Sequence, residues 1–295
     1  MDEIGLIGAG VMGRAVARKI LGGGYGLLVY DVSAFCIEKA KDLGASVAVT
    51  LAEVAEKAKI ILMLLPGPED VRACVSGEKG LLSTASAGTV IVDMSTIDPA
   101  TTTEMAALAL AKGVGYVDAP VLGRPATVGN WALPAGGRPE DIDRCRPVLS
   151  LFAAHILYAG PSGSGHKIKL LNQMMFGAIN AMTAEMMAVA SRIGIEPKLL
   201  YETITASQAG TVSNLFKELG GRIATGNYEN PTFTVDLLVK DVRLAAQMAC
   251  DHGAPPLLAR SVELMNQMAQ VQGFGSEDTA VMWKSVKRMW EKKVE

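Results

Sequence analysis

The chain has 295 residues, enough for two domains of ordinary size, with 49% hydrophobic residues and a formal net charge of −2. The near-neutral charge and the absence of a basic block argue against a nucleic-acid or anionic-membrane partner. No stretch is long and apolar enough to span a membrane, and the amino terminus enters a strand pattern without a basic leader, so we expect a cytoplasmic protein.

A glycine-rich turn follows the first apolar run, residues 4–7, and precedes a helical pattern over residues 14–21. In this context glycines let a pyrophosphate approach the backbone N–H groups at the positive end of the helix. The alternative is a strand–helix turn that holds no ligand. We predict a dinucleotide-binding site formed by Gly8, Ala9, Gly10, Val11, Met12 and Gly13.

A second predicted strand, residues 27–30, ends in Asp31, about twenty residues after the glycine turn. A carboxylate at this position accepts hydrogen bonds from both ribose hydroxyls of NAD. It repels the 2′-phosphate of NADP, and the next residues, Val32 and Ser33, supply no arginine to bind that phosphate. We therefore predict NAD, with NADP less favoured.

The remaining strands of the first half are predicted from apolar runs such as residues 60–65 and 90–93, which are typical of strands buried on both faces. Ser95 and Thr96 follow one of these strands, at the edge where a parallel sheet meets its ligands. Strand and helix patterns alternate, which predicts an α/β Rossmann domain with a doubly wound sheet over residues 1–162.

Helical patterns dominate the second half, which predicts an all-helical domain over residues 163–295. The expected helices cover residues 164–193, 197–206, 212–221, 235–253, 257–272 and 279–293. The first of them links the domains and is so apolar that we expect it to be buried or nearly buried, partly by a second subunit in a homodimer or homotetramer.

Lys169 and Asn172 lie three residues apart near the start of this apolar helix, and therefore on one face. Burying an ammonium costs free energy unless an anion meets it, so we predict that this face binds an anionic substrate. The alternative is a lysine at the wet end of the helix that reaches solvent. The four cysteines and three histidines are dispersed without metal-site spacing, so we expect free thiols and no metal.

Five motifs resemble, in the same order, those of the β-hydroxyacid dehydrogenases, which include 3-hydroxyisobutyrate dehydrogenases and tartronate semialdehyde reductases. They are GAGVMG at 8–13, DMSTIDP at 93–99, DAPV at 118–121, GSG at 163–165 with Lys169 and Asn172, and LVKD at 238–241. The resemblance covers essentially the whole chain. It implies a dehydrogenase or reductase that acts on a small 3-hydroxy acid or its semialdehyde.

The resemblance also implies roles for single residues. Lys169 matches the catalytic lysine, a general acid or base on the reacting oxygen, and Asn172 matches the asparagine that positions the substrate. Ser95 and the backbone around Gly123 match groups that hold the substrate carboxylate. The implied cofactor contacts beyond the glycine turn are Leu65, Pro66, Thr96 and Lys240, the last with an alternative role as the ion-pair partner of Asp236.

The chain departs from the family pattern after the DAPV motif. Many relatives continue with Ser-Gly-Gly, whereas here Leu122 replaces the serine and Arg124 the second glycine. The next loop, residues 125–131, looks short, and we expect Pro134 to interrupt the strand that follows. An arginine offers two parallel donors to an anion. This Gly-Arg turn resembles the sulfolactaldehyde reductases of the family, in which the arginine meets a sulfonate.

We predict an NAD-dependent oxidoreductase for a small anionic 3-hydroxy acid or semialdehyde. One alternative is a sulfolactaldehyde or tartronate semialdehyde reductase in which Arg124 binds a second anionic group; an arginine that points to solvent favours a simple 3-hydroxy acid. Gln173 after Asn172 is like the tartronate semialdehyde reductases, but we expect its side chain to face elsewhere. An imine reductase shares the architecture, although Lys169 argues against it, and a non-catalytic dinucleotide-binding module is the hypothesis from a different class.

Overall fold

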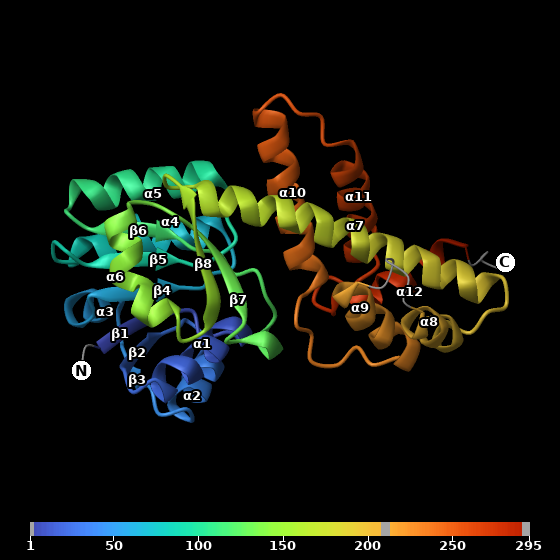
Figure 1. The fold of residues 1–295 in the computed structure, drawn as a ribbon, viewed down its shortest axis with the longest axis horizontal. Helices are drawn as coiled ribbons and strands as arrows, with labels where there is room; N and C mark the ends of the chain where they lie inside the picture. The colour runs from blue at the N-terminus through green and yellow to red at the C-terminus, as the bar shows by residue number, and fades with distance from the viewer. Residues whose placement is uncertain (1–2, 208–212, 291–295) are drawn as a thin grey trace. The chain divides into compact units, whose positions relative to one another are not determined.

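The computed structural model of the chain describes residues 3–207 and 213–290, so the predicted helix start at 212 and helix end at 291–293 lie outside the described residues. The chain divides into two compact units, Met1–Lys169 and Leu170–Glu295. The first unit is built on an eight-stranded sheet, and the second consists of helices among its described residues (Figure 1).

The sheet of the first unit has the strand order β3-β2-β1-β4-β5-β6-β7-β8. The chain fills one side of β1 first and then crosses to the other, which creates a switch point between β1 and β4, where α/β sheets bind ligands. The strands are β1 (Glu3–Ile7), β2 (Gly26–Tyr30), β3 (Ser46–Val47), β4 (Ile60–Met63), β5 (Val90–Asp93), β6 (Gly115–Asp118), β7 (Trp131–Gly136) and β8 (Ala153–Gly160).

Helices cover both faces of this sheet, as the prediction of a doubly wound fold requires. Side chains of a strand alternate between faces, so Val90 and Val92 pack against α1, α2 and α6, whereas Ile91 packs against α3, α4 and α5. The helices are α1 (Val11–Gly22), α2 (Ala34–Lys41), α3 (Leu51–Lys57), α4 (Pro68–Ser76), α5 (Pro99–Ala111) and α6 (Pro139–Leu149).

Strand β7 departs from the expected alternation. It follows β6 with only the short 3-10 helix η2 (Pro125–Thr127) between them, and it runs antiparallel to β6. Pro134 does not interrupt it, contrary to our expectation. The register that pairs Asp118 with Gly136 and Leu122 with Ala132 sets Pro134 opposite Pro120, so the two missing N–H donors fall on one residue pair and the pairing on either side of it is kept.

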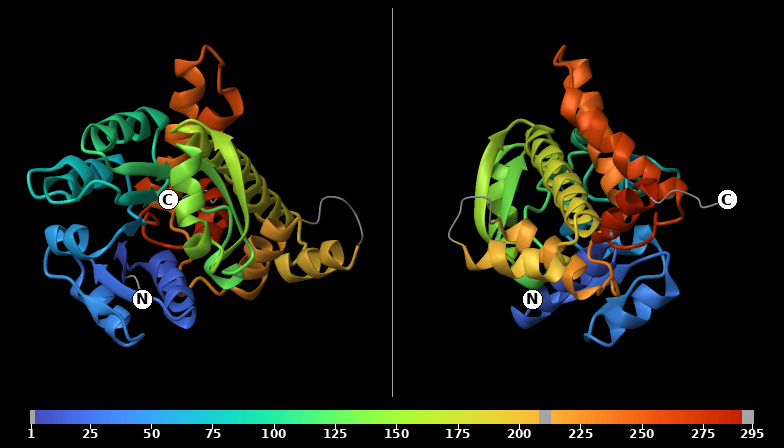
Figure 2. Two further views of the ribbon diagram at one scale, coloured as in Figure 1. Left: turned by 60° about the vertical axis from the view of Figure 1, so that its left-hand side comes forward. Right: turned by 90° about the vertical axis from the view of Figure 1, so that its right-hand side faces the viewer.

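The second unit contains the helices predicted from the sequence, with ends shifted by a few residues. Thr234 caps α10 by accepting a hydrogen bond from Leu237 N, and Gly226, with a φ of 68°, ends α9. Figure 2 shows α10 and α11 packed against each other. The elements are α7 (Ser164–Arg192), α8 (Pro197–Ala206), α9 (Asn214–Thr225), α10 (Val235–Asp251), α11 (Leu257–Val271), η3 (Thr279–Val281) and α12 (Met282–Trp290).

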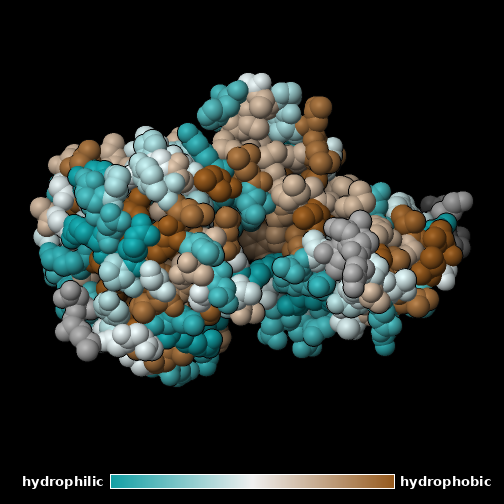
Figure 3. Space-filling model, viewed as in Figure 1, coloured by the Kyte–Doolittle hydropathy of each residue, from teal (hydrophilic) through white to brown (hydrophobic). Residues whose placement is uncertain are grey.

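Helix α7 begins in the first unit and continues into the second, and within the single chain it is not buried all round. Leu170 and Met187 are buried, but the side chains of Leu171, Met175 and Met182 are 58%, 63% and 63% exposed. One face is enough to join the helical core, which leaves an apolar stripe at the surface. Figure 3 likewise shows apolar residues on the surface of the helical unit.

Among the described residues, no helix combines the length and the apolar character needed to cross a membrane. The conclusion holds for α7 as well, the longest helix in this part of the chain, because polar residues such as Lys169, Asn172 and Glu185 interrupt its apolar sequence.

Candidate active site

The glycine turn between β1 and α1 has the geometry of a pyrophosphate-binding loop. Gly8 has a φ of 91°, and a Cβ on it would lie 2.3 Å from Leu64 O. A Cβ on Gly13 would lie 2.0 Å from Gly8 O, so both glycines are needed for the turn to pack. A Cβ on Gly10 would meet open space. The backbone at the start of α1 is therefore accessible, and these residues fit a dinucleotide phosphate.

Asp31 at the end of β2 faces this turn. Its Oδ2 accepts a hydrogen bond from Ala9 N at 2.6 Å, and its Oδ1 accepts one from Ser33 N at 2.8 Å. Each carboxylate oxygen can accept a further bond, so the pair of oxygens suits ribose hydroxyls. Arg14, which sequence analysis did not single out, donates to Ala9 O at 3.0 Å and so supports the turn.

Lys169 lies on the second turn of α7, and its Nζ donates a hydrogen bond to Val121 O at 2.9 Å, just beyond the carboxyl end of β6. The helix start fits closely here because a Cβ on Gly165 would lie 2.3 Å from Pro134 O. The backbone therefore orients the amine of Lys169 at the strand end. A lysine that only extended into solvent would not make this hydrogen bond to Val121 O.

Asp118 caps the start of α7 from β6. Its Oδ1 accepts from Gly163 N at 2.8 Å, and its Oδ2 accepts from His166 N at 3.1 Å. Burial raises the pKa of this carboxyl, while the nearby His166 and the two N–H donors oppose that rise. The aspartate of the DAPV motif thus ties the helix that carries Lys169 to the sheet.

Ser95, after β5, is held at three atoms. Its N–H donates to Asp93 Oδ1 at 2.9 Å, and its carbonyl lies 3.0 Å from His166 Nε2. Its Oγ accepts a hydrogen bond from Leu65 N at 3.0 Å, which leaves the hydroxyl hydrogen for donation to another group. Asp93 is itself locked, because Tyr116 donates its hydroxyl to Asp93 Oδ2 at 2.8 Å. Burial beside Asp93 raises the pKa of Tyr116 far above its usual value.

The turn that carries Arg124 is also rigid. Its carbonyl accepts hydrogen bonds from Trp131 Nε1 at 2.8 Å, from Thr127 N at 3.0 Å and from Thr127 Oγ1 at 3.1 Å. Trp131 is fully buried, and a Cβ on Gly123 would lie 2.1 Å from its indole ring. Leu122 pairs with Ala132 through hydrogen bonds of 2.9 and 3.2 Å. The backbone of Arg124 is fixed, and its side chain is partly buried.

In the second unit, the predicted residues Asn172 and Lys240 are connected through Gln173 and Asp241. Asn172 Nδ2 donates to Gln173 Oε1 at 3.2 Å, and Gln173 Nε2 donates to Asp241 Oδ2 at 2.5 Å. Lys240 Nζ lies 2.7 Å from Asp241 Oδ1. Gln173 is buried and Asn172 is exposed, so their side chains do leave the helix in different directions, yet their amides meet.

The structure thus brings Leu65 and Ser95 into direct contact, sets Lys169 on the strand end beyond Asp118, and joins Asn172 to Lys240 through Gln173 and Asp241. Pro66 follows Leu65 beyond the end of β4 and is exposed. Thr96 follows Ser95 beyond the end of β5 and is partly buried. Sequence analysis assigned no role to His166, Asp93 or Trp131. The contacts of His166 with Ser95 and Thr102 span 71 and 64 residues, which no local pattern indicates.

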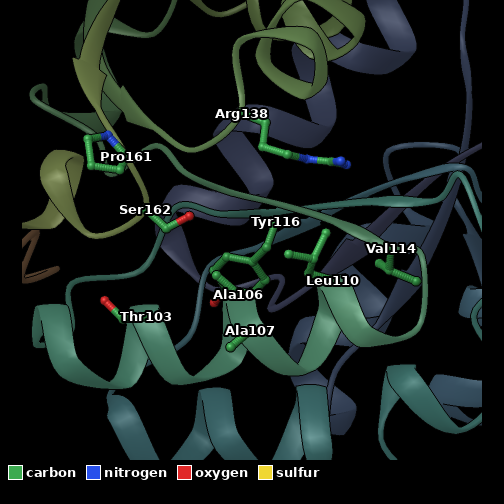
Figure 4. Close-up of a pocket in the computed structure, with 9 residues that line it drawn as sticks. All are labelled: Thr103, Ala106, Ala107, Leu110, Val114, Tyr116, Arg138, Pro161 and Ser162. Carbon is green, nitrogen blue, oxygen red and sulfur yellow. The ribbon is translucent and has the colours of Figure 1, made fainter.

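A pocket of about 280 Å³ opens beside α5 and contains none of the predicted site residues (Figure 4). Two of its polar side chains already have partners: Arg138 pairs with Asp141 at 2.8 Å, and Thr103 donates to Pro99 O at 2.9 Å. The pocket is lined by Thr103, Ala106, Ala107, Leu110, Val114, Tyr116, Arg138, Pro161 and Ser162. Among the residues described, no three His, Cys, Asp or Glu side chains gather as a metal site requires.

A doubly wound sheet with a glycine turn at its switch point, followed by a helical unit, defines the chain as an NAD(P)-dependent oxidoreductase. Residues 3–160 match the family described as the NAD binding domain of 6-phosphogluconate dehydrogenase. Residues 163–286 match the NAD-binding domain of NADP-dependent 3-hydroxyisobutyrate dehydrogenase. The chain belongs to the β-hydroxyacid dehydrogenase family, which confirms the predicted fold class and enzyme class.

The similarity to individual relatives extends over most of the length of each. The chain is 33% identical over 295 residues to 3-sulfolactaldehyde reductase of Escherichia coli, covering 97% of this chain and 96% of the relative. It is 30% identical over 282 residues to mitochondrial 3-hydroxyisobutyrate dehydrogenase of Homo sapiens, covering 93% and 84%. A crystal structure of 3-hydroxyisobutyrate dehydrogenase from Salmonella typhimurium matches with a TM-score of 0.89 at 28% identity, covering 96% and 99%.

Proposed function

We propose that the chain transfers hydride between NAD and a small anionic 3-hydroxy acid or its semialdehyde, with Lys169 as the general acid or base. The observation that carries this proposal is the amine of Lys169, held at 2.9 Å by Val121 O beyond the end of β6. It belongs to the same unit as the glycine turn and Ser95. A lysine in this position also argues against an imine reductase.

The chain's own groups have distinct roles in the proposed reaction. NAD, when bound, supplies the hydride acceptor or donor. Lys169 Nζ exchanges a proton with the substrate oxygen, and its positive charge stabilises negative charge that develops there. The hydroxyl of Ser95 donates its hydrogen to the substrate carboxylate, while Asn172 orients the substrate. The carboxylate of Asp31 selects the cofactor, and Leu65, Pro66, Thr96 and Lys240 complete its site.

The preference for NAD is tested at Asp31. Replacing Asp31 with Ser and Val32 with Arg removes the negative charge and adds a phosphate-binding guanidinium, so kcat/KM should rise for NADP relative to NAD by on the order of tenfold or more. The side chain of Val32 is 92% exposed, so an arginine fits there without repacking. Steady-state kinetics with both cofactors measures the ratio. An unchanged ratio would show that Asp31 does not face the ribose.

A second candidate is the reduction of a semialdehyde with two anionic groups, such as sulfolactaldehyde or tartronate semialdehyde. The rigid turn around Arg124 favours it, because a guanidinium on a fixed backbone is preorganised to bind an anion. The relative from Escherichia coli named 3-sulfolactaldehyde reductase supports the same candidate.

A substrate screen distinguishes these candidates. The purified protein is assayed with 3-hydroxyisobutyrate, glycerate, 4-hydroxybutyrate and sulfolactate, each with NAD and with NADP. Turnover of 3-hydroxyisobutyrate alone supports the simple hydroxy acid, and a preference for sulfolactate supports the second candidate. Cofactor binding without turnover of any hydroxy acid would instead indicate a non-catalytic dinucleotide-binding module.

The proposed enzyme is a cytoplasmic homodimer or homotetramer. The apolar stripe of Leu171, Met175 and Met182 supports an association of subunits, since large exposed apolar surfaces commonly mark interfaces. All four cysteines are free thiols, as is usual in a reducing compartment. Sedimentation velocity measures the number of subunits.

A further inference from the structure

We propose that His166 is a positioning residue that holds Ser95 ready to receive the substrate carboxylate. The inference rests on the proposed function, since it assigns that role to Ser95. His166 is fully buried, lies on α7 one turn before Lys169, and contacts three segments that are distant in sequence.

Each polar atom of His166 has a defined partner. Its ring Nε2 lies 3.0 Å from Ser95 O, and its ring Nδ1 lies 2.7 Å from Thr102 Oγ1. Its backbone N–H donates to Asp118 Oδ2 at 3.1 Å. The residue therefore joins the loop after β5, helix α5 and the end of β6 to the first turn of α7.

The chemistry of these partners determines which ring nitrogen carries a proton. A carbonyl oxygen only accepts, so Nε2 must be protonated to donate to Ser95 O. In the neutral ring, Nδ1 then accepts from the hydroxyl of Thr102 at 2.7 Å, closer than the second acceptor of that hydroxyl, Asp98 O at 3.2 Å. The donor to Ser95 is thus the same whether the ring is neutral or charged.

This bond controls the orientation of the Ser95 hydroxyl. Ser95 is only 3% exposed, so without the imidazole its carbonyl would be buried and lack a donor. The 95–96 peptide would turn to find one, and Ser95 Oγ would leave its position 3.0 Å from Leu65 N. Because α7 carries both His166 and Lys169, the same helix places the proton-transfer group and the carboxylate donor.

Two substitutions separate the two ring bonds. In His166→Gln the side-chain amide reaches the position of Nε2 and can donate to Ser95 O, but it lacks the bond to Thr102. In His166→Asn the amide reaches only the position of Nδ1, so it can meet Thr102 but not Ser95. Thr102→Val, the matched control, removes the Thr102 bond and leaves the histidine in place.

Steady-state kinetics, NAD binding and thermal unfolding are measured for all four proteins. We expect His166→Asn to raise KM for the hydroxy acid by about tenfold, the value of one buried hydrogen bond. His166→Gln and Thr102→Val should keep KM within about threefold, and NAD affinity should be unchanged throughout. If KM rises equally in His166→Gln and His166→Asn, or only in proportion to lost thermal stability, the positioning role is wrong.

Crystal structures of the two His166 variants provide a readout that needs no turnover. We expect Ser95 Oγ to stay within hydrogen-bond distance of Leu65 N in His166→Gln and to leave it in His166→Asn. An unmoved Ser95 in both variants overturns the inference. If the unmodified protein turns over no hydroxy acid, the proposed function fails, whereas these structures still decide whether His166 positions Ser95.

Discussion

Lys167 and Lys169, both on the first two turns of α7, differ in the burial of their side chains. Lys167 is exposed, whereas Lys169 is partly buried and its Nζ donates to Val121 O. Two residues correspond to about 200° around a helix, so the two side chains point to different sides. Lys167 carries the same charge on the same helix, so it can serve as a control for the catalytic role of Lys169.

Replacing Lys169 with Ala should lower kcat by on the order of 10² or more, because it removes both the proton-transfer group and the positive charge beside the reacting oxygen. Steady-state kinetics on the substrate found in the screen gives this ratio. Lys167→Ala is the control and should keep kcat within about twofold of the parent protein. Equal effects of the two substitutions would show that Lys169 only contributes general surface charge.

At the scale of elements, the starts of two helices form the candidate site. Helix α1 starts at a turn in which Gly8 and Gly13 approach backbone atoms too closely for any side chain, and α7 starts under the carboxylate of Asp118. The first N–H groups of a helix have no partner inside it. At the start of α7 the carboxylate of Asp118 accepts such bonds, whereas the start of α1 is open at Gly10. The site therefore depends on how each helix meets the sheet edge.

The glycine turn can be tested within a single helix. A Cβ on Gly13 would lie 2.0 Å from the backbone oxygen of Gly8, whereas a Cβ on Gly22 would meet nothing within 4 Å. Gly13→Ala should therefore weaken NAD binding at least tenfold and cost about 1–3 kcal/mol in the free energy of unfolding. Gly22→Ala should leave binding unchanged and stabilise the protein by up to about 1 kcal/mol.

Fluorescence titration with NAD and urea unfolding provide the two measurements for these variants. If Gly13→Ala bound NAD as well as Gly22→Ala does, the turn would have to relax by moving the Gly8 backbone. The close packing of the turn would then not be what keeps the dinucleotide site open.

At the scale of the whole molecule, burial gives three of the four cysteines different reactivities. Cys145 is fully buried in the core between the sheet and α6, and burial raises its thiol pKa to about 12. Burial likewise raises the pKa of Cys74 to about 11. Cys250, on α10, is exposed.

Alkylation should follow this division. The thiolate is the reactive form, so a pKa of about 12 leaves on the order of 10⁻⁴ of Cys145 ionised at pH 8. Brief treatment of the folded protein with iodoacetamide at pH 8 should modify Cys250 and spare Cys145 and Cys74, as mapped by peptide mass spectrometry. Raising the pH toward 10 increases the thiolate fraction of Cys145 and Cys74, but their limited access to solvent still slows the reaction. Rapid modification of Cys145 at pH 8 would contradict its placement in the core.

Features that depend on neighbouring residues could be predicted from the sequence alone. The glycine turn, the helix periods and the apolar strands are local patterns, and they were enough to predict the doubly wound sheet, the helical second half and the family. Lys169 could be singled out because an ammonium in an apolar helix is conspicuous in the sequence itself.

Only the tertiary structure decided the features that depend on pairing between distant segments. Pro134 continues a strand because the register of β7 sets it opposite Pro120, and α7 exposes one apolar face because its neighbours cover only the other. The contact of His166 with Ser95 spans 71 residues. A linear pattern shows which side chains share a face, but hydrogen bonds over such separations follow from the order and register of the strands.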